Sequence, residues 1–162
     1  MESVPIELVD VREVASRAEG IVAAFERDYG HLLAQHEVHH IGATSLPFGH
    51  TKGDVDVNVR VERAQFQGVV SALSTRLAVA QPENWTPVFA SFSADGYSLP
   101  LGVQVTVIGS DADFLLPLRD RLRADAAALR RYDDVKVAAA AGGAEAYWQE
   151  KDRLLRELLA DH

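Results

Sequence analysis

The sequence predicts an α+β fold, a mixed α/β arrangement in which a sheet of about five strands carries packed helices and the C-terminal third is helical. Short valine-rich segments that alternate apolar and polar residues indicate the strands, and apolar residues at three- and four-residue spacing indicate helices between them. Pairs of strands follow one another without an intervening helix, which argues against a fully parallel sheet. From Ser110 onward the spacing is helical throughout.

The length and composition are those of one ordinary domain. The chain has 162 residues, of which 48% are hydrophobic, so it can form a core. We expect a single domain over 1–162, with a sheet-containing core at about 1–109 and C-terminal helices at about 110–162. Cysteine is absent, which excludes disulfides, thiolate metal sites and cysteine nucleophiles.

The charge and the N-terminus restrict the expected partners and location. A formal net charge of −8 argues against binding of long DNA or RNA, but a local basic patch can still bind a small anionic ligand. No apolar run reaches the length of about 18 residues that a membrane span needs, so no membrane partner is expected. The segment MESVPIELVD is acidic and lacks the basic region and apolar run of a secretory signal, so we expect a cytoplasmic protein.

The first half of the chain alternates predicted strands and helices. In chain order we predict an edge strand at 4–9, a helix at 10–36, strands at 37–41 and 53–61, and a helix at 62–78. Asp10 is a suitable N-cap for the first helix, and Glu13 completes a capping box with it. The strand at 53–61 is the clearest of these elements, since it is rich in valine and alternates without interruption.

The second half is predicted to form a strand pair followed by helices. We predict strands at 88–94 and 102–108, and helices that begin near Ser110 and continue at 124–141 and 144–162. Asp95-Gly96 marks the turn between the strands, and the late start of the second strand indicates a connection longer than two residues. Ser110 and Asp113 form a second capping box.

The strongest candidates for a functional site lie in residues 39–61. Asp54 and Asp56 are two residues apart on the predicted strand at 53–61, so their side chains point to one face. Aspartate is depleted in strands, and two carboxylates on one face repel each other unless a cation lies between them. A hard divalent cation such as Mg²⁺ meets this need. The alternative is a pair of solvent-facing acids, and both interpretations stay open at this point.

A turn of small residues precedes these acids, formed by Gly42, Ala43, Thr44 and Ser45. Backbone N–H groups and hydroxyls in such a turn can bind phosphate, and Lys52 is a candidate partner for the same anion. Otherwise these residues form a plain turn with a side-chain hydrogen bond, and Lys52 is a solvated loop charge. His39 and His40 face opposite sides of their strand, so they do not form a metal-binding pair, and we expect one of them to lie buried beside the turn.

Basic side chains of the C-terminal helices form the second candidate group, which consists of Arg119, Arg123, Lys136 and Lys151, with Tyr132 and Tyr147 nearby. Arg119 and Arg123 are four residues apart on one helix face, where two guanidinium groups can clamp a phosphate. The alternative is salt bridging to Asp120 or Asp125 on a solvated face. The sequence has no Ser-His-Asp arrangement, P-loop or dinucleotide fingerprint.

These residues carry a family resemblance. The run H-I-G-A-T-S-L-P at 40–47, followed by Lys52 and Asp56, resembles the GrpB family pattern H-I-G-S-T-S-V-P-G, a short gap, and K-P-I-I-D-I. The segment L-R-D-R-L-R at 118–123 resembles the family's F-R-D-Y-L-R, and the later tyrosines and lysines also match, so the resemblance covers essentially the whole chain. The family belongs to the nucleotidyltransferase superfamily, whose signature is a Gly-Ser turn followed by Asp-x-Asp or Asp-x-Glu. The spacing between Ala43 and Asp54 fits that signature.

The resemblance implies a nucleotidyltransferase-like fold with a DNA polymerase β-like catalytic core. It implies that Asp54 and Asp56 are catalytic carboxylates that hold Mg²⁺, and that the turn at 42–45 contacts a nucleotide triphosphate. The implied reaction is metal-assisted nucleotidyl transfer to an unidentified acceptor. We further expect Lys52 at the phosphates, and Arg119, Arg123, Lys136 and Lys151 as a second wall of the same site.

Two departures from the family pattern keep other functions open. Ala43 replaces the serine of the motif, and the third carboxylate of the superfamily is expected near 103–107, where Gln104 and Thr106 occupy one face. These departures favour a non-catalytic regulatory module that binds a nucleotide or another phosphate ligand. A further alternative is an antitoxin-like interaction protein. An exposed apolar stripe on the last helix would be evidence for this alternative.

Overall fold

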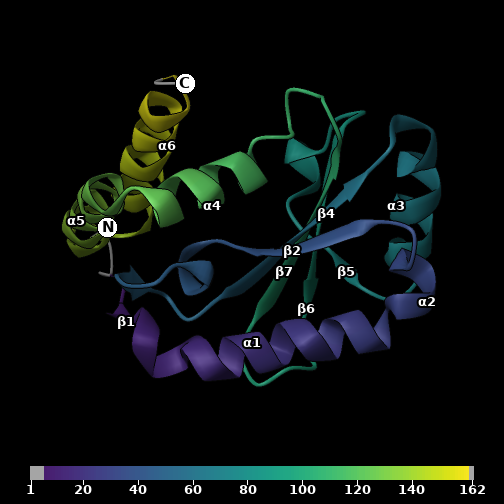
Figure 1. The fold of residues 1–162 in the computed structure, drawn as a ribbon, viewed down its shortest axis with the longest axis horizontal. Helices are drawn as coiled ribbons and strands as arrows, with labels where there is room; N and C mark the ends of the chain where they lie inside the picture. The colour runs from purple at the N-terminus through teal and green to yellow at the C-terminus, as the bar shows by residue number, and fades with distance from the viewer. Residues whose placement is uncertain (1–5, 161–162) are drawn as a thin grey trace.

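A five-stranded mixed sheet organises the fold (Figure 1). In the computed structural model, which describes residues 6–160, the strand order is β2-β4-β7-β6-β5. The strands are β2 Glu37–Ile41, β4 Val55–Val61, β5 Ala78–Val79, β6 Phe89–Ala94 and β7 Leu101–Val107. The central pair, β4 and β7, is parallel, and the other neighbours are antiparallel. The predicted mixed sheet is thus confirmed.

Helices form two groups around this sheet (Figure 1). The helices are α1 Val11–Asp28, α2 Gly30–Leu33, α3 Phe66–Ser74, α4 Leu115–Ala124, α5 Ala126–Ala141 and α6 Ala144–Ala160. The first three pack on one face of the sheet, whereas α4, α5 and α6 pack on one another around a core of their own. Over residues 6–160, no helix has the length and apolar character that a membrane span requires.

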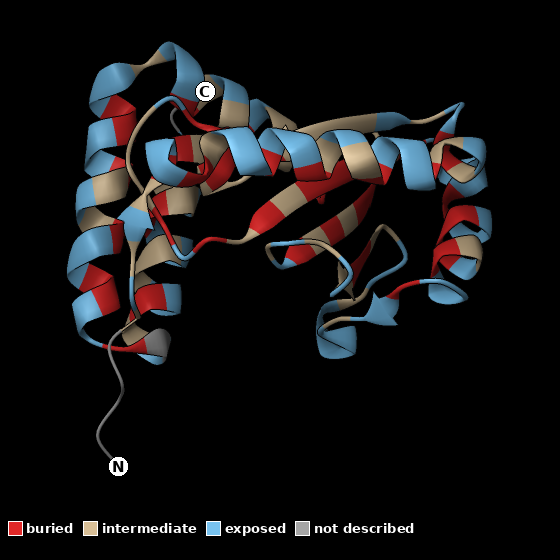
Figure 2. Cartoon of the chain, turned by 90° about the horizontal axis from the view of Figure 1, so that it is seen from below, coloured by how far each residue is buried: buried red, intermediate tan, exposed pale blue. Residues whose placement is uncertain are grey.

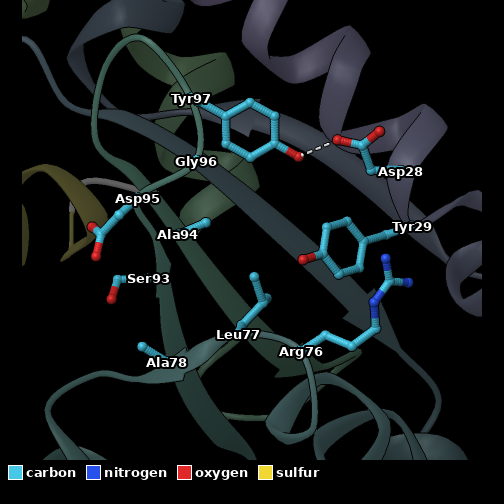
Figure 3. A pocket seen from close by; sticks show the side chains of 10 residues that line it. All are labelled: Asp28, Tyr29, Arg76, Leu77, Ala78, Ser93, Ala94, Asp95, Gly96 and Tyr97. Atoms are coloured by element: carbon cyan, nitrogen blue, oxygen red, sulfur yellow. Dashed lines mark hydrogen bonds between the residues drawn. The ribbon is translucent and has the colours of Figure 1, made fainter.

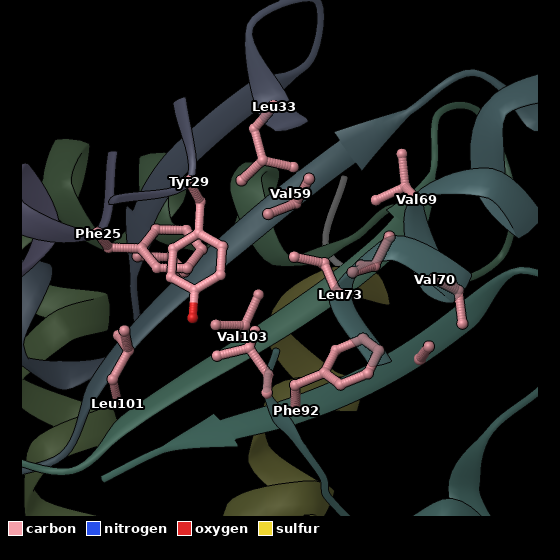
Figure 4. Close-up of a cluster of buried hydrophobic side chains, with 14 of the residues drawn as sticks. Phe25, Tyr29, Leu33, Val59, Val69, Val70, Leu73, Phe92, Leu101 and Val103 are labelled. Carbon is pink, nitrogen blue, oxygen red and sulfur yellow. The ribbon is translucent and has the colours of Figure 1, made fainter. Parts of the chain in front are cut away.

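One face of the two central strands supplies the main core (Figure 4). Alternate residues of β4 and β7 are fully buried there, because a strand points successive side chains to opposite faces. They pack against Phe25 of α1, Leu73 of α3 and Phe92 of β6. Figure 2 shows the matching pattern on the helices, whose buried positions face the sheet and whose exposed positions face outward.

The opposite face of the same strands is polar. Asp56 and Asn58 project from β4, and the register places them beside Gly102 and Gln104 of β7. The Asn58 amide is completely buried and donates hydrogen bonds to Thr106 Oγ1 at 3.0 Å and to the Gln104 carbonyl oxygen at 3.1 Å. The parallel pair therefore separates an apolar core from a polar surface that carries one of the predicted site acids.

Several predicted boundaries need correction. The helix predicted at 10–36 is divided at Tyr29 into α1 and α2, and the edge strand predicted at 4–9 is only β1, Val9–Asp10, within the described residues. β1 pairs with β3, His50–Thr51. The sequence did not predict β3 or β5, because two residues show no period. The Asp10 N-cap is confirmed, since its carboxylate accepts the Arg12 N–H at 2.8 Å.

The second predicted capping box is wrong. Asp113 does not cap a helix that begins near Ser110; its carboxylate accepts two hydrogen bonds from the Arg60 guanidinium, at 2.7 and 2.8 Å, and α4 begins at Leu115. A bidentate charge-assisted pair is stronger than a neutral cap, so the long-range partner prevails. The pair ties the start of the C-terminal helices to the central strand β4.

Asp113→Asn should destabilise the fold. The Arg60 guanidinium holds the pKa of Asp113 below its usual range, so the pair stabilises the protein at neutral pH and this stabilisation is lost as pH falls through the lowered pKa. We expect a loss of about 1–3 kcal/mol in the free energy of unfolding, measured by denaturant titration at pH 7. The exposed neighbour Asp111, changed to Asn, is the control; equal effects for the two variants would contradict this role.

Candidate functional site

The predicted phosphate turn follows the end of β2. Its residues form a single 3₁₀ turn, η1 Ala43–Ser45, preceded by Gly42 at φ +74°, a conformation that favours glycine. The Ser45 hydroxyl donates to the Gly42 carbonyl oxygen at 2.6 Å, and Thr44 Oγ1 lies 2.9 Å from His40 Nε2. Both hydroxyls therefore already have partners within the protein.

The Asp56 carboxylate lies in a cradle formed by two glycines, Gly42 and Gly102. The register puts Ile41 and Gly102 beside Asp56 on the two neighbouring strands. A methyl group at Gly42 would lie 2.8 Å from Asp56 Oδ2, and one at Gly102 would lie 2.7 Å from Oδ1. Only glycine at these two positions leaves room for the carboxylate in its present place.

Burial dominates the electrostatics of Asp56. Desolvation raises the pKa of its carboxyl, and the negative charge of Asp54 raises it further. The positive charge of Lys151, a hydrogen bond from the Gln104 side chain and the charge of Lys52 oppose this shift. The nearby lysines and the Gln104 hydrogen bond thus offset only part of the desolvation cost of the ionised Asp56 carboxylate.

Asp54 lies one residue before β4 rather than inside the strand, which corrects its predicted placement. Its side chain is 40% exposed, and its Oδ2 lies 3.1 Å from Lys52 Nζ. The two acids are still close enough for their charges to interact, as the pKa of Asp56 indicates. Both residues are partly exposed, and the Asp56 carboxylate is the one that lies between the two glycines.

Lys52 and Lys151 lie near these acids, and Lys136 lies near the same two lysines and 3.9 Å from Asp133 Oδ1. Lys136 is only 3% exposed, and burial together with the charge of Lys151 lowers the pKa of its ammonium to about 8, against an opposing effect of Asp133. The structure therefore brings Lys151 of α6 near Asp56, whereas the acidic partner of Lys136 of α5 is Asp133. Their role in binding remains a prediction.

Two buried tyrosines, Tyr132 and Tyr147, lie near Asp56 and the lysines. Burial is the main cause of a raised pKa at both Tyr132 and Tyr147, and the charge of Asp56 adds to it in each case. Lys136 Nζ lies 5.1 Å from the centroid of the Tyr132 ring. The rings support ammonium groups of the site through cation–π contacts.

Arg119 and Arg123 do not reach these acids in the structure; they hold the backbone around the turn. Arg119 Nη1 donates to the His40 carbonyl oxygen at 3.1 Å, and Arg123 Nε donates to the Ser45 carbonyl oxygen at 3.0 Å. Burial and these two guanidinium groups lower the pKa of His40 to about 4, so its ring is neutral at pH 7. A hollow of about 460 Å³, lined by His40, Thr44, Arg123 and neighbouring residues, lies on this side of the turn.

One positioning contact had no signal in the sequence. His50 Nδ1 lies 2.8 Å from Asp133 Oδ2, and the His50 N–H donates to Oδ1 at 2.7 Å. The two residues are 83 positions apart, and neither belongs to a recognisable motif. The pair fastens the loop between the turn and the acids to α5.

No third acid joins Asp54 and Asp56. Gly102 lies opposite Asp56 and Gln104 follows it on the same face of β7, where the superfamily's third carboxylate is expected. Across residues 6–160, no group of three or more histidine, aspartate or glutamate side chains is placed to hold a metal ion. The Gln104 Oε1 atom is buried and accepts no hydrogen bond from the described residues.

Comparison with known proteins assigns the family. A family model described as GrpB protein matches residues 9–161. The chain belongs to the GrpB family. It is 24% identical over 147 residues to UPF0157 protein VC_A0354 of Vibrio cholerae, covering 91% of this chain and 78% of that protein. The crystal structure of conserved protein GrpB from Enterococcus faecalis has the same fold, with a TM-score of 0.69 and 17% sequence identity over 96% of this chain and 98% of that one.

A cavity of about 500 Å³ in this GrpB protein lies away from the predicted site (Figure 3). It opens between the end of α1 and strands β5 and β6, where the Tyr97 hydroxyl donates to Asp28 Oδ2 at 2.7 Å. Arg76 lies over the Tyr29 ring at 4.3 Å on its other side. None of the predicted site residues lines it. The residues of the GrpB motif therefore lie outside this cavity.

Gly102→Ala should disturb the Asp56 cradle and destabilise the fold by about 1–3 kcal/mol in denaturant titrations, because the new methyl group meets the carboxylate. Gly20→Ala is the matched control: Gly20 lies within α1 with no atom near its missing methyl, so it should stabilise by about 0.5–1 kcal/mol.

A double-mutant cycle identifies the cause of the Gly102→Ala effect. If the carboxylate is the obstacle, the cost of Gly102→Ala should largely disappear in an Asp56→Ala background. An undiminished cost in that background would show that the cradle is not what requires glycine at this position.

Proposed function

We propose that this GrpB protein binds a nucleotide, or a related phosphate-bearing small molecule, together with Mg²⁺ at Asp54 and Asp56. The observation that supports this most is the cradle: a desolvated carboxylate, enclosed by two glycines, faces a group of lysines. Such an arrangement costs stability unless a ligand compensates the charges. The nucleotidyltransferase-like fold that GrpB membership suggests is consistent with this function.

The donor set suits Mg²⁺. This cation prefers oxygen ligands and is commonly held by one or two carboxylates together with substrate phosphates. Asp54 and Asp56 supply the carboxylates, and the unpartnered Gln104 Oε1 is a further oxygen on the same face. When bound, Mg²⁺ would neutralise phosphate charge and polarise the phosphoryl group. In this arrangement Mg²⁺ replaces the Lys52 ammonium at Asp54, and Lys52 contacts the phosphate of the ligand instead.

The lysines are the proposed phosphate contacts. Lys52, Lys136 and Lys151 gather beside Asp54, Asp56 and Asp133, so the site concentrates positive charge although the whole chain is acidic. Since Lys136 has a lowered pKa of about 8, its contribution to anion binding should fade as pH rises through that value. The site is thus most attractive to phosphate below pH 8.

The turn contributes through its backbone. Because the Thr44 and Ser45 hydroxyls are already hydrogen-bonded, and the Ser45 N–H donates to the Gly42 carbonyl oxygen at 3.0 Å, the proposed contacts of the turn with phosphate come from the N–H groups of residues 42–44. Replacement of the motif serine by Ala43 then matters less for binding than the motif alone suggests. Arg119 and Arg123 serve this contact indirectly, since they fix the carbonyl groups on either side of the turn.

A non-catalytic binding module is the second candidate, and one observation favours it. Gln104 and Thr106 occupy the face of β7 where the third carboxylate would be expected, and a larger side chain at Gly102, directly opposite Asp56, would displace that acid. Nucleotidyl transfer by a two-metal mechanism relies on carboxylates that clamp both ions. Binding is therefore the primary proposal, and transfer to an acceptor is a secondary one.

Thermal unfolding with ligands tests the proposal. Mg²⁺ is titrated alone and with ATP, GTP, CTP or UTP, and Tm is compared between the natural chain, Asp54→Asn and Asp56→Asn. At 100 times its Kd, a ligand stabilises by about 2.7 kcal/mol, which corresponds to about 5–10 °C for a domain of this size. We expect an Mg²⁺-dependent shift that both substitutions abolish.

Asp95→Asn is the matched control, because Asp95 is an exposed aspartate in the β6–β7 connection. It should leave the shift unchanged. Absence of any nucleotide shift in the natural chain would refute the binding proposal. Release of pyrophosphate from labelled nucleotides then separates a transferase from a binding module.

A further inference from the structure

Trp148 is the most exposed aromatic side chain beside the proposed phosphate site. It is 47% exposed on α6, whereas its neighbour Tyr147 is 2% exposed and packs inward. The two rings meet edge to face, with centroids 5.0 Å apart. Leaving so much indole in water sacrifices burial energy, so its position calls for an explanation beyond packing.

Trp85, the other tryptophan, has a structural role in the core. Trp85 is partly buried, packs edge to face on Phe92 with centroids 5.3 Å apart, and donates its indole N–H to the Ala80 carbonyl oxygen at 3.0 Å. Among the described residues, no hydrogen bond from the Trp148 indole N–H is found. Trp148 therefore lacks the anchoring that Trp85 has.

The position of Trp148 links it to the charged groups of the site. Lys52 Nζ lies 4.4 Å and Lys151 Nζ 5.0 Å from the centroid of an indole ring that still faces solvent. Lys52 Nζ is also 3.1 Å from Asp54 Oδ2. A ligand whose phosphates reach these two ammonium groups must therefore pass beside the ring.

The geometry points to Trp148 as a stacking platform for the aromatic base of a nucleotide whose phosphates are bound by Lys52 and Lys151. This inference rests on the proposed function and narrows its ligand to nucleoside polyphosphates, as opposed to inorganic or sugar phosphates. Stacking tolerates any base, because every base has a π face, so Trp148 selects for the presence of a base rather than its identity.

Affinity measurements with and without a base test this role. All variants carry Trp85→Phe, so that Trp148 is the single tryptophan and its fluorescence reports binding. MgATP and Mg-tripolyphosphate are titrated into this protein and into versions with Trp148→Ala or Trp148→Tyr; isothermal calorimetry replaces fluorescence where tryptophan is lost. Unfolding curves establish that each variant is folded.

We expect MgATP to quench Trp148 and to bind more tightly than tripolyphosphate. Trp148→Ala should weaken MgATP binding by about 5- to 150-fold, the range for loss of one base stack, while tripolyphosphate affinity changes less than about twofold. Trp148→Tyr should retain most of the MgATP affinity, since a tyrosine ring still stacks.

The experiment distinguishes failure of the stacking role from failure of the proposed function. Equal affinity of the natural site for MgATP and tripolyphosphate, or equal losses of both in Trp148→Ala, would overturn the stacking role and leave phosphate binding intact. Binding of neither compound would overturn the proposed function itself, and the stacking role with it.

Discussion

The burial of the Asp56 carboxylate between Gly42 and Gly102 is the constraint around which the site is built. A raised pKa means that the folded state holds the proton more tightly than the unfolded chain. Stability therefore falls as pH rises from the ordinary carboxyl range through the raised pKa, and at neutral pH the ionised group opposes folding. The valine face of β4 and β7 offsets this cost. A cation at the carboxylate would remove it, which connects the local destabilisation to ligand binding.

The C-terminal helices are part of the site rather than a separate cover. Asp113 ties the approach to α4 onto β4, and Asp133 fastens the loop before the acids to α5. Arg119 and Arg123 fix the carbonyl groups beside the turn. These contacts join the C-terminal third of the chain to the strand-and-turn segment, so Lys151 of α6 is held near Asp56. The site is consequently defined by two parts of the chain that are distant in sequence.

Local chemistry explains which features the sequence could predict. The sheet strands at 37–41 and 55–61 follow from period-two alternation, and the Asp10 cap and the small-residue turn follow from residues within a few positions. The partners of Asp113 and His50 depend on how α4 and α5 dock, which no spacing encodes. Spacing also predicts that Arg119 and Arg123 share a helix face. It does not predict the carbonyl groups that they contact, because these depend on how α4 docks. The glycine at position 102 became meaningful only through its register with Asp56.

The pKa of the Asp56 carboxyl, followed by ¹³C NMR titration with and without Mg²⁺, tests the central claim most directly. In the metal-free protein the pKa should lie above its ordinary value of 3.8, because burial disfavours the charge. Saturating Mg²⁺ should lower it, because a bound cation favours the ionised form. A pKa at or below the ordinary value, unmoved by Mg²⁺, would contradict the account of Asp56 as a desolvated cation ligand.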